Sequence, residues 1–200
     1  MLRLAKRIRS TTSEGPGARY AVWVQGCAIR CAGCCNPEMF APTGGELVSC
    51  LDLVADITSS PAIEGVSFLG GEPFEQAAAL ANVARSVRAA GLSVMTYTGR
   101  VYEELVANEN PAELDLLANT DLLADGPFDR AQPGSRYRWL GSQNQRLFAL
   151  SARYSLDDPR LVGANTIDIR LGRDGLLEIS GWPALADALA RDLSPRRRPR

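Results

Sequence analysis

Three cysteines with the spacing CxxxCxxC constrain this chain more than any other feature of its sequence. They are Cys27, Cys31 and Cys34, and the residues around them show no helical period, so we expect them in a loop. A loop can turn three sulfurs toward one point, and cysteine thiolates are the usual ligands of iron–sulfur clusters. Three ligands leave one iron of a four-iron cluster without a protein sulfur. The spacing therefore predicts a [4Fe-4S] site with one open iron.

The remaining cysteines and the absence of histidine limit which kinds of site the chain can build. The chain has five cysteines, four of them within residues 27–35, which suits a metal site in a reducing compartment better than a disulfide framework. We therefore expect a cytoplasmic protein. Histidine is absent, which excludes a Ser-His-Asp triad, a Cys-His pair and His-ligated zinc. The fifth cysteine, Cys50, falls near the apolar face of a helical pattern and is interpreted as a core thiol.

Length and charge favour one domain without a charged macromolecular partner. The 200 residues are 46% hydrophobic, enough for a buried core, and we expect a single domain over 1–200. We place its core at about 11–150, an extension at about 155–193 and a disordered arginine- and proline-rich tail at 194–200. A net charge of −1 predicts no electrostatic partner in nucleic acid or in an anionic membrane. No run approaches the roughly 20 apolar residues of a membrane span.

Strand and helix patterns alternate along the core. Alternation of this kind predicts right-handed crossovers and a parallel sheet. Because an eight-unit barrel needs about 250 residues, we predict an open, partial parallel β/α barrel. The expected strands are 2–9 at an edge, 21–24, 65–69, 93–98, 121–124 and 146–150, and the expected helices are 47–58, 75–90, 101–107 and 111–118.

The C-terminal part has a different pattern. Apolar residues alternate with polar ones over 167–171, and the turn at 172–175 leads to Leu177 and Ile179, which predicts a hairpin. Pro183 then opens a last helical pattern, whose apolar side carries Leu185, Leu189 and Leu193.

Three glycine-containing polar segments follow predicted strands, at 26–35, 70–73 and 125–127. The carboxyl ends of parallel strands are where such folds build their sites. We therefore expect these three segments to meet in space.

These residues support a resemblance to a known family. The cysteine spacing, followed by Gly70-Gly71-Glu72-Pro73, resembles the radical S-adenosylmethionine (SAM) superfamily. Over roughly residues 11–150 the chain further resembles the activating enzymes of anaerobic (class III) ribonucleotide reductase. The segments that carry this likeness are Gly15-Pro16-Gly17-Ala18-Arg19, Gly26-Cys27, Gly33-Cys34, Asn36, Asp125-Gly126-Pro127-Phe128 and Gly141-Ser142-x-Asn144-Gln145-Arg146.

The resemblance implies a specific reaction. It implies reductive cleavage of SAM at the open iron to methionine and a 5′-deoxyadenosyl radical. In the activating enzymes this radical takes a hydrogen atom from a glycine of the partner, which leaves a glycyl radical. The protein supplies geometry, potential and exclusion of competing reactions. An external low-potential donor of the flavodoxin or ferredoxin kind is implied, because Cys35 and Cys50 cannot build a second cluster.

The resemblance also assigns site residues. It implies that the cysteine triad holds the cluster and that Gly70 to Pro73 hold the amino acid end of SAM, with glycine backbone approaching the ligand closely. Glu72 could accept from the SAM ammonium or from a neighbouring backbone group. The further residues assigned to the cofactor are Gly33, Cys35, Thr96, Thr98, Asp125, Gly126, Asn144 and Arg146.

Simpler interpretations stand beside these assignments. Gly70 to Pro73 could form a tight strand-to-helix turn with Pro73 at the first helical position, and 125–127 could be a turn alone. Asn144 and Arg146 could bind SAM or the partner, or satisfy backbone groups around a loop. Cys35 departs from the family, which places an aromatic residue or histidine there near the adenine. It could be a ligand or a small packing residue.

Three functions therefore remain from the sequence. The first is an activating enzyme that installs a glycyl radical in anaerobic ribonucleotide reductase. The second is a stand-alone radical SAM enzyme that modifies a peptide or small metabolite, which Cys35 and the unmatched C-terminal segment favour. The third is a structural zinc or electron-transfer module, although zinc needs four ligands and the nearest spare thiol, Cys35, adjoins Cys34.

Overall fold

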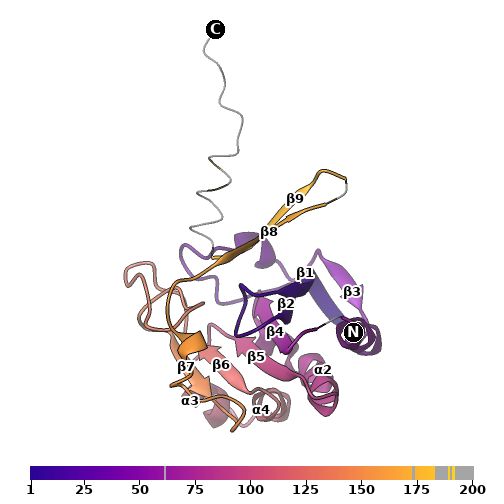
Figure 1. The fold of residues 1–200 in the computed structure, drawn as a ribbon. Helices are drawn as coiled ribbons and strands as arrows, with labels where there is room; N and C mark the ends of the chain where they lie inside the picture. The colour runs from indigo at the N-terminus through magenta and orange to yellow at the C-terminus, as the bar shows by residue number, and fades with distance from the viewer. Residues whose placement is uncertain (61, 173, 183–188, 190, 192–200) are drawn as a thin grey trace.

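A seven-stranded mixed sheet carries the fold (Figure 1). The computed structural model describes residues 1–60, 62–172, 174–182, 189 and 191. The strand order in the sheet is β3-β1-β2-β4-β5-β6-β7. The strands are β1 (Leu2–Thr11), β2 (Arg19–Val24), β3 (Glu46–Val48), β4 (Gly65–Gly70), β5 (Ser93–Tyr97), β6 (Leu122–Asp125) and β7 (Arg146–Ala149).

The four central strands, β2, β4, β5 and β6, are parallel, as the alternating pattern predicts. The outer strands β1, β3 and β7 pair antiparallel with their neighbours. The α/β class and the parallel centre of the sheet are therefore confirmed. The sheet is open, with β3 and β7 at its two edges, and it does not close into a barrel.

Two details at the N-terminal side differ from the sequence prediction. The segment 2–9 was expected at an edge, but β1 lies between β2 and β3. The helix expected from residue 47 begins only at Cys50, because Leu47 belongs to β3. Ser49 separates the two elements, and its hydroxyl accepts a hydrogen bond from the Asp52 N–H (3.0 Å), which caps the helix.

Four helices cover one face of the sheet. They are α1 (Cys50–Thr58), α2 (Ala77–Ala89), α3 (Tyr102–Ala107) and α4 (Pro111–Ala118). Side chains of the parallel strands, such as Val66 and Phe68, are buried against them. None of the helices in the described part of the chain is both long and apolar enough to cross a membrane.

The opposite face of the sheet has a second, smaller core. Met95 and Leu122 from the sheet pack there with Tyr154 and Leu161, which come from the chain after β7. Arg19 is fully buried on this face, and its guanidinium donates to Ser67 Oγ (2.8 Å) and to backbone and hydroxyl oxygens of neighbouring strands. The chain beyond β7 therefore completes the fold and does not merely follow it.

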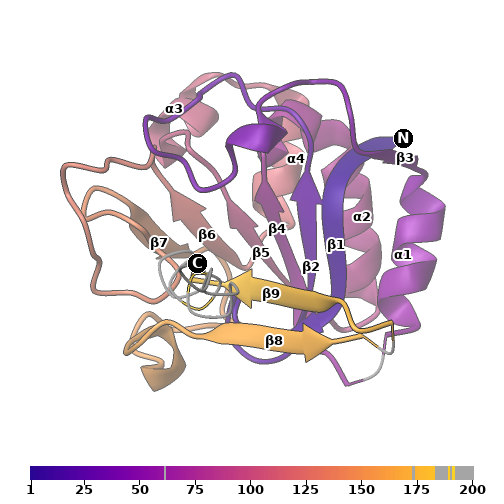
Figure 2. The same ribbon diagram turned by 90° about the horizontal axis from the view of Figure 1, so that it is seen from above.

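The predicted C-terminal hairpin is confirmed. It consists of β8 (Ile167–Leu171) and β9 (Leu177–Gly181), which pair antiparallel. Figure 2 shows the hairpin crossing the sheet on the side opposite the helices, away from the ends to which the parallel arrows point. The helix expected after Pro183 and the tail 194–200 lie outside the described residues, apart from Leu189 and Arg191.

The hairpin is held to β1 through polar groups. The Asp168 carboxylate accepts from the Thr12 N–H (2.9 Å), and Lys6 pairs with Glu178 (3.2 Å). The alternate side chains point the other way, and Leu171 is 74% exposed. The hairpin therefore adds little apolar contact to the core.

Candidate iron–sulfur site

The turn after β4 lies directly against the start of the cysteine loop. The Gly71 N–H donates to the Val24 carbonyl (2.8 Å), and the Glu72 N–H donates to the Gly26 carbonyl (2.8 Å). Both bonds form because β2 and β4 are adjacent parallel strands whose carboxyl ends reach the same edge. Two of the three segments predicted to meet are thus in hydrogen-bond contact.

The third segment joins them through the end of β5. The Thr98 N–H donates to the Ala124 carbonyl (2.8 Å) and the Thr98 hydroxyl donates to the Glu72 carboxylate (2.8 Å). The Gly126 N–H donates to the Arg100 carbonyl (2.9 Å). The expected meeting of residues 26–35, 70–73 and 125–127 at one edge of the sheet is therefore confirmed.

The cysteine loop is irregular and partly open to solvent. Gly26 and Gly33 have φ of 102° and 80°, in the left-handed region that favours glycine, and Arg30 adopts a φ of 53°. Near the first cysteine, the Ala28 N–H donates to Glu75 Oε1 (2.6 Å). The predicted loop conformation is confirmed, and the loop is fixed at its start by hydrogen bonds to the turn after β4.

The three predicted ligands are free, half-buried thiols. Hydrogen bonding from the Cys35 thiol, helped by the Asn36 N–H, lowers the pKa of Cys34 to about 6. Burial raises the pKa of Cys27. Because a thiolate is the form that binds metal, Cys34 is more easily made ready for iron than Cys27.

These thiols fit a cluster better than a single ion. In the described part of the chain, no three His, Cys, Asp or Glu side chains gather closely enough to hold one metal ion. That the three sulfurs turn toward one cluster stays a prediction. A four-iron cluster has each thiolate on a different iron, whereas structural zinc needs four ligands around one centre. The donor set therefore suits a cluster and argues against the zinc module.

The two remaining cysteines differ in place and surroundings. Cys35 is exposed, and interaction with the neighbouring Cys34 thiol raises the pKa of Cys35. Cys50 begins α1, packs beside the helical core and donates weakly to the Ala79 carbonyl (3.6 Å). The core-thiol interpretation of Cys50 matches this position, and the role of Cys35 stays a prediction.

Glu72 is buried and bonded to the protein itself. It is 1% exposed, and its carboxylate accepts from the Phe74 N–H (3.0 Å), the Thr98 hydroxyl and the Gly99 N–H (2.9 Å). Burial raises the pKa of Glu72 to about 7. Of the two partners expected for this side chain, the backbone one is present, and the SAM ammonium stays a prediction.

The segment Gly70 to Pro73 is also the tight turn that the sequence allowed. Pro73 opens a short 3-10 helix (Pro73–Gln76) that Glu72 caps. A Cβ on Gly71 would lie 2.1 Å from the Gly26 carbonyl oxygen, so only glycine permits this approach of the two loops. The turn and a ligand role are compatible, because the turn places glycine backbone beside the cysteine loop.

The two threonines of β5 and its end lie differently. Thr98 is at the loop edge and bonds Glu72. Thr96 is fully buried within β5, and its hydroxyl is hydrogen-bonded to Thr120 (2.8 Å). The expectation that both threonines line one rim therefore fails for Thr96, because its side chain is buried in the interior of the sheet, where its hydroxyl bonds to Thr120.

The remaining predicted residues are bonded to each other around the end of β6. Arg146 donates to the buried Asp125 carboxylate (3.0 Å from Nε) and to Glu103 (2.7 Å). The Asn144 side chain donates to the Pro127 carbonyl (2.7 Å), and its Oδ1 is buried without a partner among the described residues. Asn144 thus satisfies a backbone group of a neighbouring loop, as one interpretation of the sequence expected. Contact with SAM stays a prediction for Asp125, Asn144 and Arg146.

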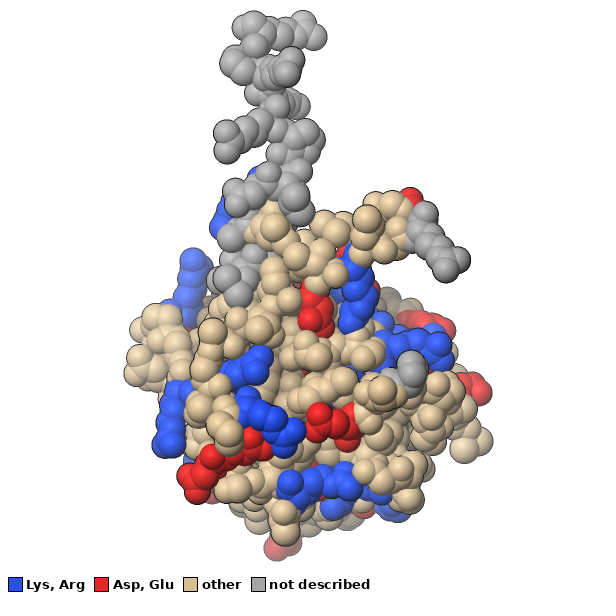
Figure 3. Space-filling model, in the orientation of Figure 1, with Lys and Arg blue, Asp and Glu red and all other residues tan. Residues whose placement is uncertain are grey.

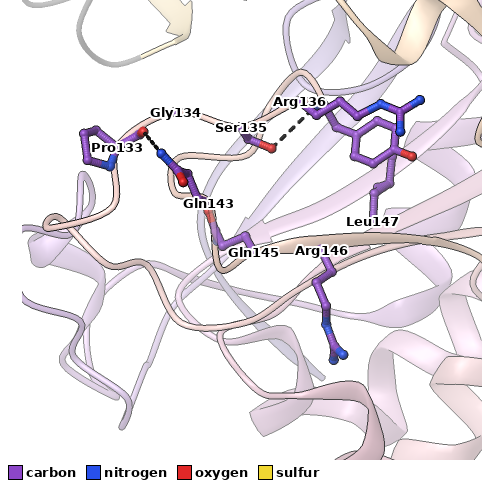
Figure 4. Close-up of a pocket in the computed structure, with 9 residues that line it drawn as sticks. Pro133, Gly134, Ser135, Arg136, Gln143, Gln145, Arg146 and Leu147 are labelled. Atoms are coloured by element: carbon purple, nitrogen blue, oxygen red, sulfur yellow. Dashed lines mark hydrogen bonds between the residues drawn. The ribbon is translucent and has the colours of Figure 1, made fainter.

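A cavity of about 540 Å³ lies beside this region, between the loop at 133–137 and the start of β7. Figure 4 shows Gln143 directed toward Pro133, while the Arg146 side chain points away from that loop. None of the cysteines lines the cavity. It is therefore separate from the cysteine loop and from the turn after β4.

The structure adds two residues that the sequence reasoning missed. Glu75 bonds the cysteine loop at Ala28, and the stem of Arg130 lies over Gly33. Neither belongs to a segment that the motifs single out. Only the approach of separate loops at the sheet edge places them here.

An open α/β sheet with a loop of free thiols at the carboxyl edge of its parallel strands suits an iron–sulfur protein of the α/β class. A family model described as a 4Fe-4S single cluster domain matches residues 13–148. The chain therefore belongs to the 4Fe-4S single cluster domain family.

Proteins similar to this chain include several activating proteins. The anaerobic ribonucleoside-triphosphate reductase-activating protein of Enterobacteria phage T4 is 28% identical over 142 residues, 68% of this chain and 86% of that protein. The protein of the same name from Escherichia coli K12 is 27% identical over 140 residues, 66% and 88% of the two chains. The pyruvate formate-lyase-activating enzyme of Clostridium pasteurianum is 29% identical over 112 residues, 52% and 47%.

Proposed function

We propose that this chain is a radical SAM activating enzyme that generates a glycyl radical on a partner, anaerobic ribonucleotide reductase. One observation carries the proposal. The CxxxCxxC loop is hydrogen-bonded to the Gly70–Pro73 turn at the carboxyl edge of four parallel strands. The names of the relatives, which are activating proteins for that reductase and for pyruvate formate-lyase, support the choice of partner.

In this proposal, different segments of the chain bind the cluster and SAM. Cys27, Cys31 and Cys34 hold the [4Fe-4S] cluster through three thiolates. When bound, the cluster and SAM supply the one-electron chemistry that removes a hydrogen atom from a glycine. The turn at 70–73 holds the amino acid end of SAM, and Thr98 and 125–126 lie beside its ribose.

The open sheet suits a macromolecular substrate. We interpret the fold as a partial barrel of the radical SAM type, because four parallel strands present their carboxyl ends along one edge and the sheet does not close. Because the sheet does not close, a peptide segment of the partner has room to reach the cysteine loop at the carboxyl ends of the strands. Exposed, irregular loops on a rigid sheet are a usual place for such contacts.

The proposal needs an external electron donor. Apart from the triad, the described chain offers Cys35, a free and exposed thiol next to Cys34, and Cys50, which lies on α1. These two thiols cannot form a second cluster, so we propose a flavodoxin- or ferredoxin-type donor. The free thiols also fit a reducing compartment such as the cytoplasm.

A second candidate function is a stand-alone radical SAM enzyme that modifies a peptide or small metabolite. The observation that favours it is the hairpin β8–β9, which lies beyond the residues matched by the family model. An added element beside the sheet is where a different substrate could be recognised.

The test is anaerobic reconstitution with iron and sulfide, followed by SAM and dithionite. We expect about four irons per chain, 5′-deoxyadenosine as product, and a glycyl electron-spin signal once an anaerobic ribonucleotide reductase is added. Alanine variants of Cys27, Cys31 or Cys34 should lose iron and product, whereas Cys50→Ala should keep both. Product without a glycyl signal would leave the stand-alone enzyme, and a complete cluster without product would reject both functions.

A further inference from the structure

Arg130 lies against the cysteine loop although it comes from the opposite side of the site. It follows β6, which ends at Asp125. A Cβ built on Gly33 would lie 3.0 Å from Arg130 Cδ and 3.7 Å from its Cβ and Cγ. Gly33 immediately precedes Cys34, so the alkyl stem of Arg130 passes over the backbone between the second and third cysteines.

The guanidinium at the end of this stem has no acidic partner in the described part of the chain. Within the described part of the chain Arg130 forms no salt bridge. Its neighbour Asp129 accepts instead from the Ala131 N–H (2.8 Å) and from the Gln132 side chain (2.7 Å). Arg130 therefore carries a positive charge, with no acidic partner among the described residues, on a stem that lies beside the loop.

The other side of the loop carries negative charge. The carboxylate of Glu75 accepts from the Ala28 N–H, one residue after Cys27. Three thiolates would add further negative charge to a cluster held here. Each electron added to such a site works against these charges, and a nearby cation offsets them.

We propose that Arg130 raises the reduction potential of the cluster held by Cys27, Cys31 and Cys34. The inference rests on the proposed cluster site and concerns how easily that site accepts its electron. Arg130 acts through its charge, without ligating iron. Cluster potentials depend on local charge, hydrogen bonding and solvent exposure, so a cation at the loop surface favours the reduced form.

Redox titration of the reconstituted full chain tests this, with the reduced cluster followed by its electron-spin signal in the absence of SAM and partner. For Arg130→Gln we expect the ratio of reduced to oxidised cluster at a fixed solution potential to fall roughly tenfold. Arg130→Lys keeps the charge and should stay near wild type. Arg136→Gln removes another exposed arginine of the same loop, one that lies over the Tyr137 ring, and should leave the ratio unchanged.

Each outcome decides the matter. An unchanged ratio in Arg130→Gln, an equal fall in Arg136→Gln, or a fall in Arg130→Lys as large as in Arg130→Gln would overturn the proposal. Lower iron content in Arg130→Gln than in wild type would also overturn it, because the side chain would then hold the loop. A missing glycyl radical with the expected shift would instead reject the proposed function and leave the role of Arg130 standing.

Discussion

A single buried carboxylate joins the loops that form the candidate site. Glu72 follows Gly70, the last residue of β4, and Gly71, and it connects three groups, the Phe74 N–H, the Thr98 hydroxyl and the Gly99 N–H. A buried carboxyl group is tolerated when hydrogen bonds replace water, although burial still favours its neutral form. Glu72 therefore links the ends of β4 and β5 and gives the molecule a titrating group in its interior.

The pH dependence of stability follows from this residue. The folded pKa of Glu72 is about 7, above its usual 4.5, so its contribution to stability is fully present below pH 4.5 and is lost as pH rises through 7. From pH 4.5 to pH 7.5 we expect the unfolding free energy of wild type to fall, relative to that of Glu72→Gln, by up to about 3 kcal/mol. Urea unfolding of both chains at the two pH values measures it. A relative rise over this pH range would contradict the assignment.

At the scale of elements, the contact between the ends of β2 and β4 is the most restrictive feature. Hydrogen bonds join Gly71 to Val24 and Glu72 to Gly26, and no side chain fits between these backbones. The strand-to-helix turn after β4 therefore fixes the position at which the cysteine loop begins. Gly91, which follows α2, differs, because a Cβ there would meet nothing within 4 Å.

Two alanine substitutions compare the crowded Gly71 with the unhindered Gly91. In Gly71→Ala the new methyl would meet the Gly26 carbonyl oxygen at 2.1 Å, so the loops must part. We expect a loss of roughly 3 kcal/mol or more in stability and reduced iron incorporation. Gly91→Ala meets nothing within 4 Å and bears only the strain of a φ of 88°, about 1 kcal/mol. Unfolding curves and iron analysis measure both, and equal effects in the two variants would refute the argument.

At the scale of the whole molecule, the C-terminal quarter contains two parts with different roles. Tyr154 and Leu161 are buried in the second core, and the Tyr154 hydroxyl is hydrogen-bonded to Ser93 (2.8 Å) next to the buried Arg19. The hairpin beyond them is held by polar contacts to β1. Figure 3 shows acidic and basic side chains interspersed over this face of the molecule, in keeping with its nearly balanced charge.

Truncation should reveal this division. A chain that ends at Thr166 loses the hairpin and its polar contacts, and we expect it to keep most of its unfolding free energy, with a loss of about 1–2 kcal/mol. A chain that ends at Leu150 also loses Tyr154 and Leu161, which should remove about 5 kcal/mol more. Denaturant unfolding of both compares them. A shorter chain as stable as the longer one would show that the second core contributes nothing.

Much of the fold could be predicted because its elements depend on local patterns. Hydrophobic periodicity predicted helices at 101–107 and 111–118, which the structure has at Tyr102–Ala107 and Pro111–Ala118, as well as the parallel strands and the hairpin, since each period reflects which side of an element is buried. It could not show that β1 lies inside the sheet. That position depends on the pairing of Leu2–Leu4 with Glu46–Val48, residues far apart in the chain.

The candidate site divides in the same way. The sequence by itself determined the chemistry, because thiols at Cys27, Cys31 and Cys34 and glycines at 70 and 71 are fixed by residue type and spacing. Tertiary structure decided which groups share that site: it turned Thr96 away, bonded Arg146 to Asp125 and brought Arg130 over Gly33. The reason is physical, since residue type sets what an atom can bind, whereas packing of distant strands sets what it meets.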